Sequence, residues 1–295
     1  IDVIRVWVKA SPAKTFHNRM LFYLTYMINA CLAGLLMARG NYDLIYATSP
    51  PLFVGGAAQM LSVLKRIPFV FEVRDLWPES AIALKEISNP LAITWASRLE
   101  ESCYRNSRAV ITVTQGIKSR LVERGISPDK IALIQNGSNV DLFQFRPEGR
   151  ERIRAELNLE RKFVAIYAGI HGIAQGLECL VEAARLLFTD PTLSDPDSHL
   201  LMIGDGPRKA EIARLAEKYK LPNLTLLPEQ PNLLIPDYLS AADVAVIPLR
   251  NLEVFKGALP SKLFDAWACQ LPVLLSVDGE ARLILETAQA GYFVP

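Results

Sequence analysis

One polar cluster of the sequence could act on a hydroxyl group. It is Arg-Asp-Leu-Trp-Pro-Glu-Ser at 74–80, and it ends the apolar run 69–74, so we expect it at the end of a strand. The carboxylates of Asp75 and Glu79 could orient sugar hydroxyls or exchange protons with them, and Arg74 could orient both carboxylates. The same residues also fit a local structural role, in which Arg74 pairs with Asp75 and Glu79 begins a helix.

Two glycine turns could receive an anion. Each follows an apolar run and precedes a helical stretch, a place where the backbone can approach a phosphate. Their spacing is not that of a dinucleotide fingerprint, and no Gly-Lys pair for a Walker loop occurs. Tight turns alone would explain the glycines equally well. The turns are Gly169-Ile170-His171-Gly172, with Gln175 and Gly176 behind it, and Gly204-Asp205-Gly206.

A third loop places a cation beside a carboxylate. Ser261 could cap the helix expected at 261–269, and Lys262 would then lie in its first turn, where its charge opposes the helix dipole. A bound phosphate would remove that conflict. Asp265 follows on the same helical face and could accept hydrogen bonds from a ribose. A solvated lysine and an exposed carboxylate remain the alternative interpretation.

Composition excludes several classes of protein. The 295 residues carry 32 Lys and Arg against 31 Asp and Glu, so the net charge of +1 argues against a nucleic-acid partner. A hydrophobic content of 51% argues against disorder. The four cysteines and three histidines are scattered, and Asp195-Pro196-Asp197 has no companion ligands nearby. We therefore expect neither a disulfide framework nor a metal site.

The elements that must position these residues alternate along the chain. Continuous apolar runs predict buried parallel strands at 3–8, 44–49, 69–74, 109–114, 131–136, 163–168, 199–204, 224–228, 244–249 and 273–277. Helical stretches such as 89–105, 177–188, 207–219 and 261–269 separate them. The pattern predicts two doubly wound, Rossmann-like α/β domains, 1–147 and 148–295, with about five strands each and a cleft between them.

These loops together resemble bacterial glycosyltransferase family 4, and within it the L-fucosamine transferase-like (WbuB-like) branch. The resemblance implies the GT-B fold and retaining, metal-independent hexosyl transfer from a UDP-linked, N-acetylated sugar, without a further cofactor. The acceptor would be a polyprenyl-diphosphate-linked sugar at the cytoplasmic face of the plasma membrane, in O-antigen or exopolysaccharide synthesis. The similar stretches are YATSPPL (46–52), EVRDLWPES (72–80), QNGSNVDLF (135–143), YAGIHGIAQGLE (167–178), IGDGPRK (203–209) and LPSKLFDAWACQLPVLLS (259–276).

The resemblance also implies roles for the candidate residues. Asp75, Glu79 and Arg74 would act near the acceptor hydroxyl, and Asp265 would stand where the family has the second glutamate of its E-x7-E pattern. The first glutamate would fall at Gly257, and the family's diphosphate-clamping Arg and Lys would fall at Ile170 and Gln175, so these contacts are lost. The donor site would comprise Gly169, His171, Gly172, Gln175, Gly204, Asp205, Gly206, Ser261, Lys262 and Asp265, with 228–232 beside the base.

Two further expectations concern the membrane and the ends of the chain. The uncharged stretch 20–38 is too polar for a convincing membrane span. The helix around 16–39 is therefore expected in the core or at the membrane surface, with the aromatic side chains of Phe16, Phe22, Tyr23 and Tyr26 as the contacts in the second case. Family members usually have an additional strand before 3–8 and helices after 292–294. A UDP-sugar epimerase and a non-catalytic nucleotide-sugar-binding assembly protein are the alternative functions.

Overall fold

The chain folds into two compact units, Ile1–Gln135 and Asn136–Pro295, called here the first and the second unit. The computed structural model describes residues 2–11 and 16–295. Each unit contains a parallel β-sheet with helices packed on it, so the prediction of two parallel-sheet α/β domains is confirmed. The structure divides the chain at 135/136, and a functional division at 147/148 stays a prediction.

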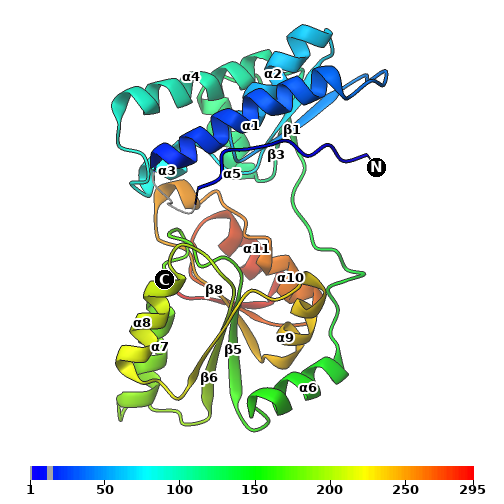
Figure 1. Ribbon diagram of the computed structural model, residues 1–295. Helices are drawn as coiled ribbons and strands as arrows, with labels where there is room; N and C mark the ends of the chain where they lie inside the picture. Colours follow the sequence, from blue (N-terminus) through cyan, green and yellow to red (C-terminus); the bar gives the residue numbers. More distant parts are fainter. Residues whose placement is uncertain (1, 12–15) are drawn as a thin grey trace. The chain divides into compact units, whose positions relative to one another are not determined.

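The first unit has a four-stranded parallel sheet whose strands follow in chain order, β1-β2-β3-β4. Right-handed crossovers between such strands place the connecting helices on one face of the sheet. On that face α2 packs on β1 and β2, and α1 and α4 pack in turn on α2 (Figure 1). The strands are β1 (Ile45–Ser49), β2 (Phe69–Val73), β3 (Ala109–Thr112) and β4 (Ile131–Leu133). The helices are α1 (Phe16–Leu36), α2 (Phe53–Lys65), α3 (Glu79–Ala83), α4 (Pro90–Asn106), α5 (Gln115–Glu123) and the short η1 (Pro128–Lys130).

A buried charged group joins α4 to the end of α5 in the first unit. The Glu100 carboxylate accepts hydrogen bonds from the Tyr104 hydroxyl at 2.5 Å and from Arg124 Nη2 at 2.7 Å. Its side chain is only 2% exposed, and burial raises its pKa, against the opposing effect of the Arg124 and Tyr104 hydrogen bonds. Arg124 therefore neutralises a carboxylate that water cannot reach.

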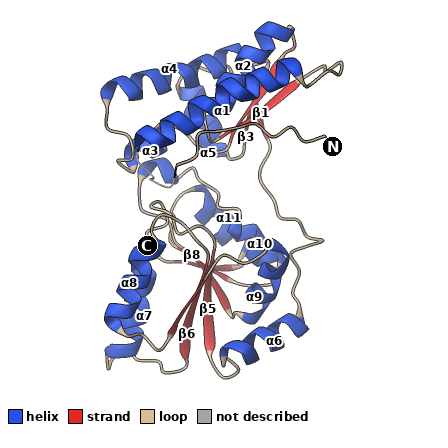
Figure 2. Cartoon of the chain, in the orientation of Figure 1, coloured by secondary structure: helices blue, strands red, loops and turns tan. Residues whose placement is uncertain are grey.

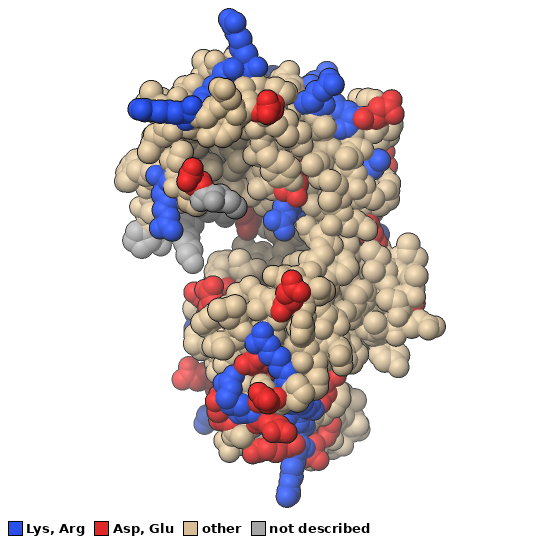
Figure 3. Space-filling model, turned by 90° about the vertical axis from the view of Figure 1, so that its right-hand side faces the viewer, with Lys and Arg blue, Asp and Glu red and all other residues tan. Residues whose placement is uncertain are grey.

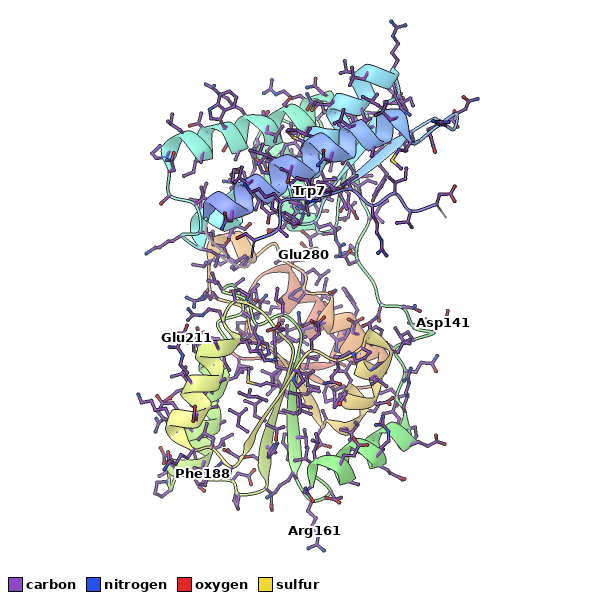
Figure 4. All side chains as sticks on the ribbon, viewed as in Figure 1. Trp7, Asp141, Arg161, Phe188, Glu211 and Glu280 are labelled. Carbon is purple, nitrogen blue, oxygen red and sulfur yellow. The ribbon has the colours of Figure 1, made fainter. Side chains whose placement is uncertain are left out.

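The strand predicted at 3–8 is wrong. These residues join no sheet, and two backbone groups of residues 7–9 bond to side chains of α1 instead. Asn29 Nδ2 donates to the Trp7 carbonyl at 2.8 Å, and Lys9 N–H donates to Thr25 Oγ1 at 3.1 Å. Trp7 accordingly lies alongside α1, as Figure 4 shows.

Helix α1 is half-buried along its length. Its Tyr23 ring stacks on Phe53 of α2 at a centroid distance of 5.6 Å, so this aromatic side chain belongs to the core. Ile28, Leu32 and Leu36 form an exposed stripe on the same helix. Within the described residues no helix is both long and apolar enough to cross a bilayer. The Phe16 side chain, at the start of the predicted membrane-contacting segment, lies outside the described part.

The second unit has a six-stranded parallel sheet of order β10-β9-β8-β5-β6-β7. Helices α7 and α8 cover one face, and α9 and α10 cover the other (Figure 2). Its strands are β5 (Phe163–Ala168), β6 (Ser198–Ile203), β7 (Leu224–Leu227), β8 (Val244–Ile247), β9 (Val273–Leu275) and β10 (Gly291–Phe293). Its helices are α6 (Pro147–Leu157), α7 (Glu178–Thr189), α8 (Lys209–Tyr219), η2 (Asn232–Leu234), α9 (Ile235–Ala241), η3 (Glu253–Phe255), α10 (Lys262–Ala268) and α11 (Glu280–Ala288).

Two kinds of contact hold the second unit together. An apolar core of fully or nearly fully buried side chains, including Tyr167, Val181, Met202 and Ile212, fills the space under α7 and α8. On the other face, arginines in and just before α6 form ion pairs with Asp237 of α9 and with Asp243 just before β8. On the surface of this unit basic and acidic side chains are interspersed (Figure 3). The four helices and the nine later strands predicted from the sequence are confirmed. Together with β10, which is not among those nine runs, the strands form sheets of four and six, where about five each were predicted.

Candidate functional site

The second unit contains a pocket of about 500 Å³ at the carboxyl ends of its strands. The strand order reverses between β5 and β8, since the chain runs outward through β6 and β7 and returns to β8 on the other side of β5. Ligands of open α/β sheets bind at such a switch point. Arg161, labelled in Figure 4, precedes β5 at the opposite end of the sheet. The walls include Ala168, Gly169, Ile203, Gly204, Asp205, Gln230, Val246, Ile247, Ser261, Lys262 and Asp265.

Lys262 places a positive charge in this pocket without a carboxylate partner. Its side chain lies against Gly169, and its Nζ lies 5.8 Å from the centre of the Tyr167 ring. Among the described residues, no carboxylate oxygen lies within ion-pair distance of Nζ. Burial lowers the pKa of Lys262, and the charge of Asp265 opposes this shift. A partly buried cation with a free face is suited to receive an anion.

Asp265 lies one turn further along α10 and faces the same pocket. Its Oδ1 accepts a hydrogen bond from the Ser138 hydroxyl at 2.7 Å. Burial raises the pKa of Asp265, while the Ser138 hydrogen bond and the Lys262 charge act in the opposite direction. Ser261 occupies the N-cap position of α10, as predicted, but its side chain makes no capping hydrogen bond.

The two predicted glycine turns pack directly on each other. A Cβ at Gly204, where φ is +147°, would lie 1.9 Å from the Gly169 carbonyl oxygen. Two backbone hydrogen bonds join the turns, from Gly169 N–H to the Ile203 carbonyl at 2.9 Å and from His171 N–H to the Asp205 carbonyl at 2.8 Å. This close approach requires glycine at position 204. The turns therefore form one backbone platform at the pocket wall.

Six of the ten predicted donor-site residues line the pocket, namely Gly169, Gly204, Asp205, Ser261, Lys262 and Asp265. His171, Gly172, Gln175 and Gly206 do not. His171 is 1% exposed and lies beneath the turns, with its ring 5.8 Å from Tyr167. Neither ring nitrogen has a hydrogen-bond partner within the part of the chain that is described. Burial, helped by the charge of Lys209, lowers the pKa of His171, which favours a neutral imidazole.

Sequence reasoning missed the pocket residues that come from the segment between β4 and α6. Phe143 is buried and lines the pocket, and Ser138 reaches Asp265 from the same segment. Asp141, also on this segment and labelled in Figure 4, is exposed. The only signal in the sequence was the similarity of 135–143 to its family. Apolar side chains of α9, Ile235 and Leu239, and the predicted base-side residues Glu229, Gln230 and Asn232 complete the walls.

The carboxylates predicted for the acceptor lie at the end of β2 in the first unit. Asp75 Oδ2 accepts a hydrogen bond from the Ser80 hydroxyl at 3.0 Å, and burial raises the pKa of Asp75 despite that bond. Glu79 begins α3 and forms an ion pair with Arg120 at 3.2 Å. Arg74 is exposed, and neither carboxylate is its ion-pair partner. The partners that orient the carboxylates are thus Ser80 and Arg120, where the sequence predicted Arg74.

No group of three potential metal-ligating side chains occurs among residues 2–11 and 16–295. At the Asp195-Pro196-Asp197 sequence, Asp195 Oδ1 accepts the Asp197 N–H at 3.0 Å, as in an ordinary turn.

Comparison with known proteins matches two family models, one to each half of the chain. Residues 1–137 match the family model described as a glycosyl transferase 4-like domain, and residues 149–295 match the one described as glycosyl transferases group 1. WcaI of Escherichia coli, named as a colanic acid biosynthesis glycosyl transferase, is 24% identical in an alignment of 275 residues that covers 91% of this chain and 64% of WcaI. The chain thus spans less than two thirds of this relative.

Solved structures share the fold. The structure of Anabaena HepE in complex with UDP and glucose has a TM-score of 0.73 at 18% identity, covering 91% of this chain and 68% of HepE. Sucrose-phosphate synthase from Thermosynechococcus elongatus has a TM-score of 0.72 at 20% identity, covering 98% of this chain and 69% of the synthase. With one sheet domain matching each of the two family models, the chain belongs to the glycosyltransferases of the GT-B fold.

Proposed function

We propose that the protein transfers a hexosyl group, N-acetylated as in the L-fucosamine transferase-like branch, from a UDP-sugar to a lipid-linked acceptor in cell-surface polysaccharide synthesis. Transfer proceeds with retention and without a metal or other cofactor. The name of the relative WcaI supports the polysaccharide role, and the UDP and glucose in the HepE structure support the class of donor. The first unit takes the acceptor, and the second unit takes the donor.

The observation that carries this proposal is the unpaired Lys262 in the switch-point pocket. A departing nucleoside diphosphate gains negative charge in the transition state, and a preorganised cation in a partly dry site stabilises that charge. Gly169 leaves room for the Lys262 side chain and Gly204 for the Gly169 carbonyl, so the two turns form one backbone platform beside the lysine, on which the phosphates would lie. Asp265, on the same side of α10, accepts a hydrogen bond from the ribose. The resulting order along the pocket is diphosphate at Lys262 and base near Gln230.

Asp75 is the group we assign to the acceptor hydroxyl. Its raised pKa makes its carboxylate a better proton acceptor than an exposed aspartate, and Ser80 fixes its orientation. Glu79 and Arg74, close in sequence, contribute to binding the acceptor sugar.

The first unit is also the part we expect at the membrane surface, where a polyprenyl-diphosphate-linked acceptor resides. Residues 1–135 carry 16 Lys and Arg against 10 Asp and Glu, whereas residues 136–295 carry 16 against 21. Exposed apolar side chains lie on α1 (Ile28, Leu32, Leu36) and α2 (Met60, Val63, Leu64). Basic charge with exposed apolar groups suits a surface of anionic lipid on the cytoplasmic side. The expected contacts are therefore these aliphatic side chains, not Phe22 and Tyr26, which are partly buried.

The test is a panel of UDP-sugars, assayed with the full-length enzyme for UDP release in the presence of a polyprenyl-diphosphate-linked acceptor. Lys262→Ala should lower kcat/KM about a hundredfold or more, the cost of losing one preorganised charge partner. Lys256→Ala is the matched control, because Lys256 is exposed and its ammonium forms an ion pair with Glu253 at the surface. Near-normal turnover of the Lys262 variant would refute the diphosphate role.

The same assay separates the alternatives. Interconversion of the UDP-sugar without an acceptor would indicate an epimerase. Binding of UDP without any transfer would indicate an assembly protein, an outcome that Gly257, Ile170 and Gln175 make worth testing because the family has charged residues at these positions.

A further inference from the structure

The segment between β4 and α6 lines the pocket through Phe143, and its Ser138 binds Asp265, another lining residue. The Ser138 hydroxyl donates to Asp265 Oδ1 at 2.7 Å, across 127 positions of sequence. Phe143, five residues later, is buried in the pocket wall. Both contacts lie within the second unit. This connecting segment therefore reaches the proposed ribose carboxylate and does more than link the two sheets.

The partners of Asp265 differ from those of the structural carboxylates of the same unit. Asp237 forms ion pairs with Arg146 and Arg152, and Asp243 forms ion pairs with Arg150 and Arg154. Each of these two carboxylates has both oxygens occupied by guanidinium groups. Asp265 has one neutral hydroxyl on Oδ1, and within the described residues no hydrogen-bond donor reaches Oδ2. A carboxylate held at one oxygen and free at the other is oriented but not neutralised.

The free oxygen also lies in a suitable place. Asp265 and Lys262 both line the pocket, yet they do not form an ion pair, so the lysine does not occupy the carboxylate. An aspartate is one methylene shorter than the glutamate that the family has at this position. Its carboxylate therefore has to point directly at the ribose hydroxyl in order to reach it.

We propose that Ser138 is a positioning residue for the donor: by holding Oδ1 of Asp265, it directs Oδ2 toward a ribose hydroxyl of the nucleotide. This inference rests on the proposed role of Asp265 in the donor site. Ser138 itself does not touch the nucleotide. Its removal lets the Asp265 side chain rotate, and the nucleotide then has to order the carboxylate when it binds.

The experiment measures UDP binding by isothermal titration calorimetry on the full-length protein. Ser138→Ala should weaken UDP affinity about tenfold, the usual effect of losing a hydrogen bond to a charged group. Ser138→Thr, which keeps the hydroxyl, should restore affinity to within about twofold. Asn139→Ala is the matched control, because it removes only the side-chain Oδ1 that accepts the Asp141 N–H and keeps the backbone carbonyl that accepts the Phe143 N–H.

A double variant separates positioning from a general effect on the fold. If Ser138 acts through Asp265, then Ser138→Ala in an Asp265→Ala background should cause no further loss of UDP affinity, because the carboxylate that Ser138 holds is gone. Equal losses in both backgrounds, or no rescue by threonine, would overturn the inference. If Asp265→Ala weakens UDP binding but Ser138→Ala does not, only the positioning role fails. If Asp265→Ala binds UDP like the wild type, the ribose assignment of the proposed function fails instead.

Discussion

Replacing Gly169 by alanine tests whether the placement of Lys262 controls donor binding. An added Cβ would lie 2.1 Å from Lys262 Cε and 2.7 Å from its Nζ. Two carbon atoms need about 3.5 Å, so the lysine end must move by about 1.4 Å. The obstacle is the far end of a flexible side chain, so the lysine can be displaced without disrupting the fold.

The size of the effect follows from that displacement. Misplacing a group by about 1 Å can cost about a hundredfold in activity, so Gly169→Ala should approach the loss expected for Lys262→Ala. A smaller effect on stability comes from the φ of +149° at position 169. Alanine at such a φ costs about 1 kcal/mol or somewhat more, which lowers the melting temperature of a domain of this size by roughly 2–4 °C.

The assay is a double-mutant cycle on UDP affinity and turnover. Once Lys262 is alanine, the methyl group at 169 has nothing to displace, so Gly169→Ala/Lys262→Ala should match Lys262→Ala within about threefold. Independent effects would multiply to about ten-thousandfold. Gly125→Ala is the control for backbone strain, because Gly125 has φ +85° and open space around its Cβ position. Wild-type UDP affinity in Gly169→Ala, or multiplied losses in the double variant, would refute the reasoning.

Three further predictions concern charge. Burial lowers the pKa of Lys262, so its ammonium loses its proton at a lower pH than an ordinary lysine does. The affinity for a UDP-sugar should therefore begin to fall at that lower pH, as calorimetry at several pH values would record. Arg124→Ala leaves the buried Glu100 unpaired and should cost about 3–5 kcal/mol of stability, measured by thermal unfolding. In that variant the pKa of Glu100 rises further, so the loss should grow from acid toward neutral pH. Asp75→Asn should lower kcat about 10²–10⁴-fold while UDP affinity stays unchanged.

Each of these predictions has a control. The loss of UDP-sugar affinity at alkaline pH should be absent in Lys262→Ala, because this variant lacks the ammonium group that titrates. A loss that persists in the variant would belong to another group. Arg105→Ala removes a surface ion pair in which the arginine is 71% exposed, and should cost less than about 1 kcal/mol. Weakened UDP binding in Asp75→Asn would contradict its assignment to the acceptor.

Most of the fold was predictable because parallel strands that are buried on both faces have continuous apolar sequences. The runs at 163–168 and 199–204 correspond closely to β5 and β6. The run at 3–8 is similarly apolar, but an apolar sequence does not show whether a neighbouring strand is available for pairing. The Trp7 carbonyl and the N–H of Lys9, just after the run, bond to side chains of α1, and nothing local to 3–8 indicates Thr25 or Asn29 as partners.

The candidate site was predictable where its parts are close in sequence. Lys262 and Asp265 lie on one short helix, and Gly169 and Gly204 end adjacent strands, so the rules for parallel sheets bring them together. Ser138 and Phe143 could not be placed that way, since their contacts depend on how the connecting segment crosses the second unit. Whether a loop residue faces the pocket, as Gly169 does, or lies under it, as His171 does, is decided by packing of side chains between the turns.

The segment from Asn136 to Arg146 has a consequence for building chimeric enzymes. It is fastened to the second unit through Ser138, through Phe143 and through Arg146, whose guanidinium donates to Asp237. A chimera joined at 147/148 would combine the proposed donor pocket of one parent with a pocket wall from the other. A junction at 135/136 would transfer Asp265 together with the serine that holds it, so donor preference should then travel with the exchanged piece.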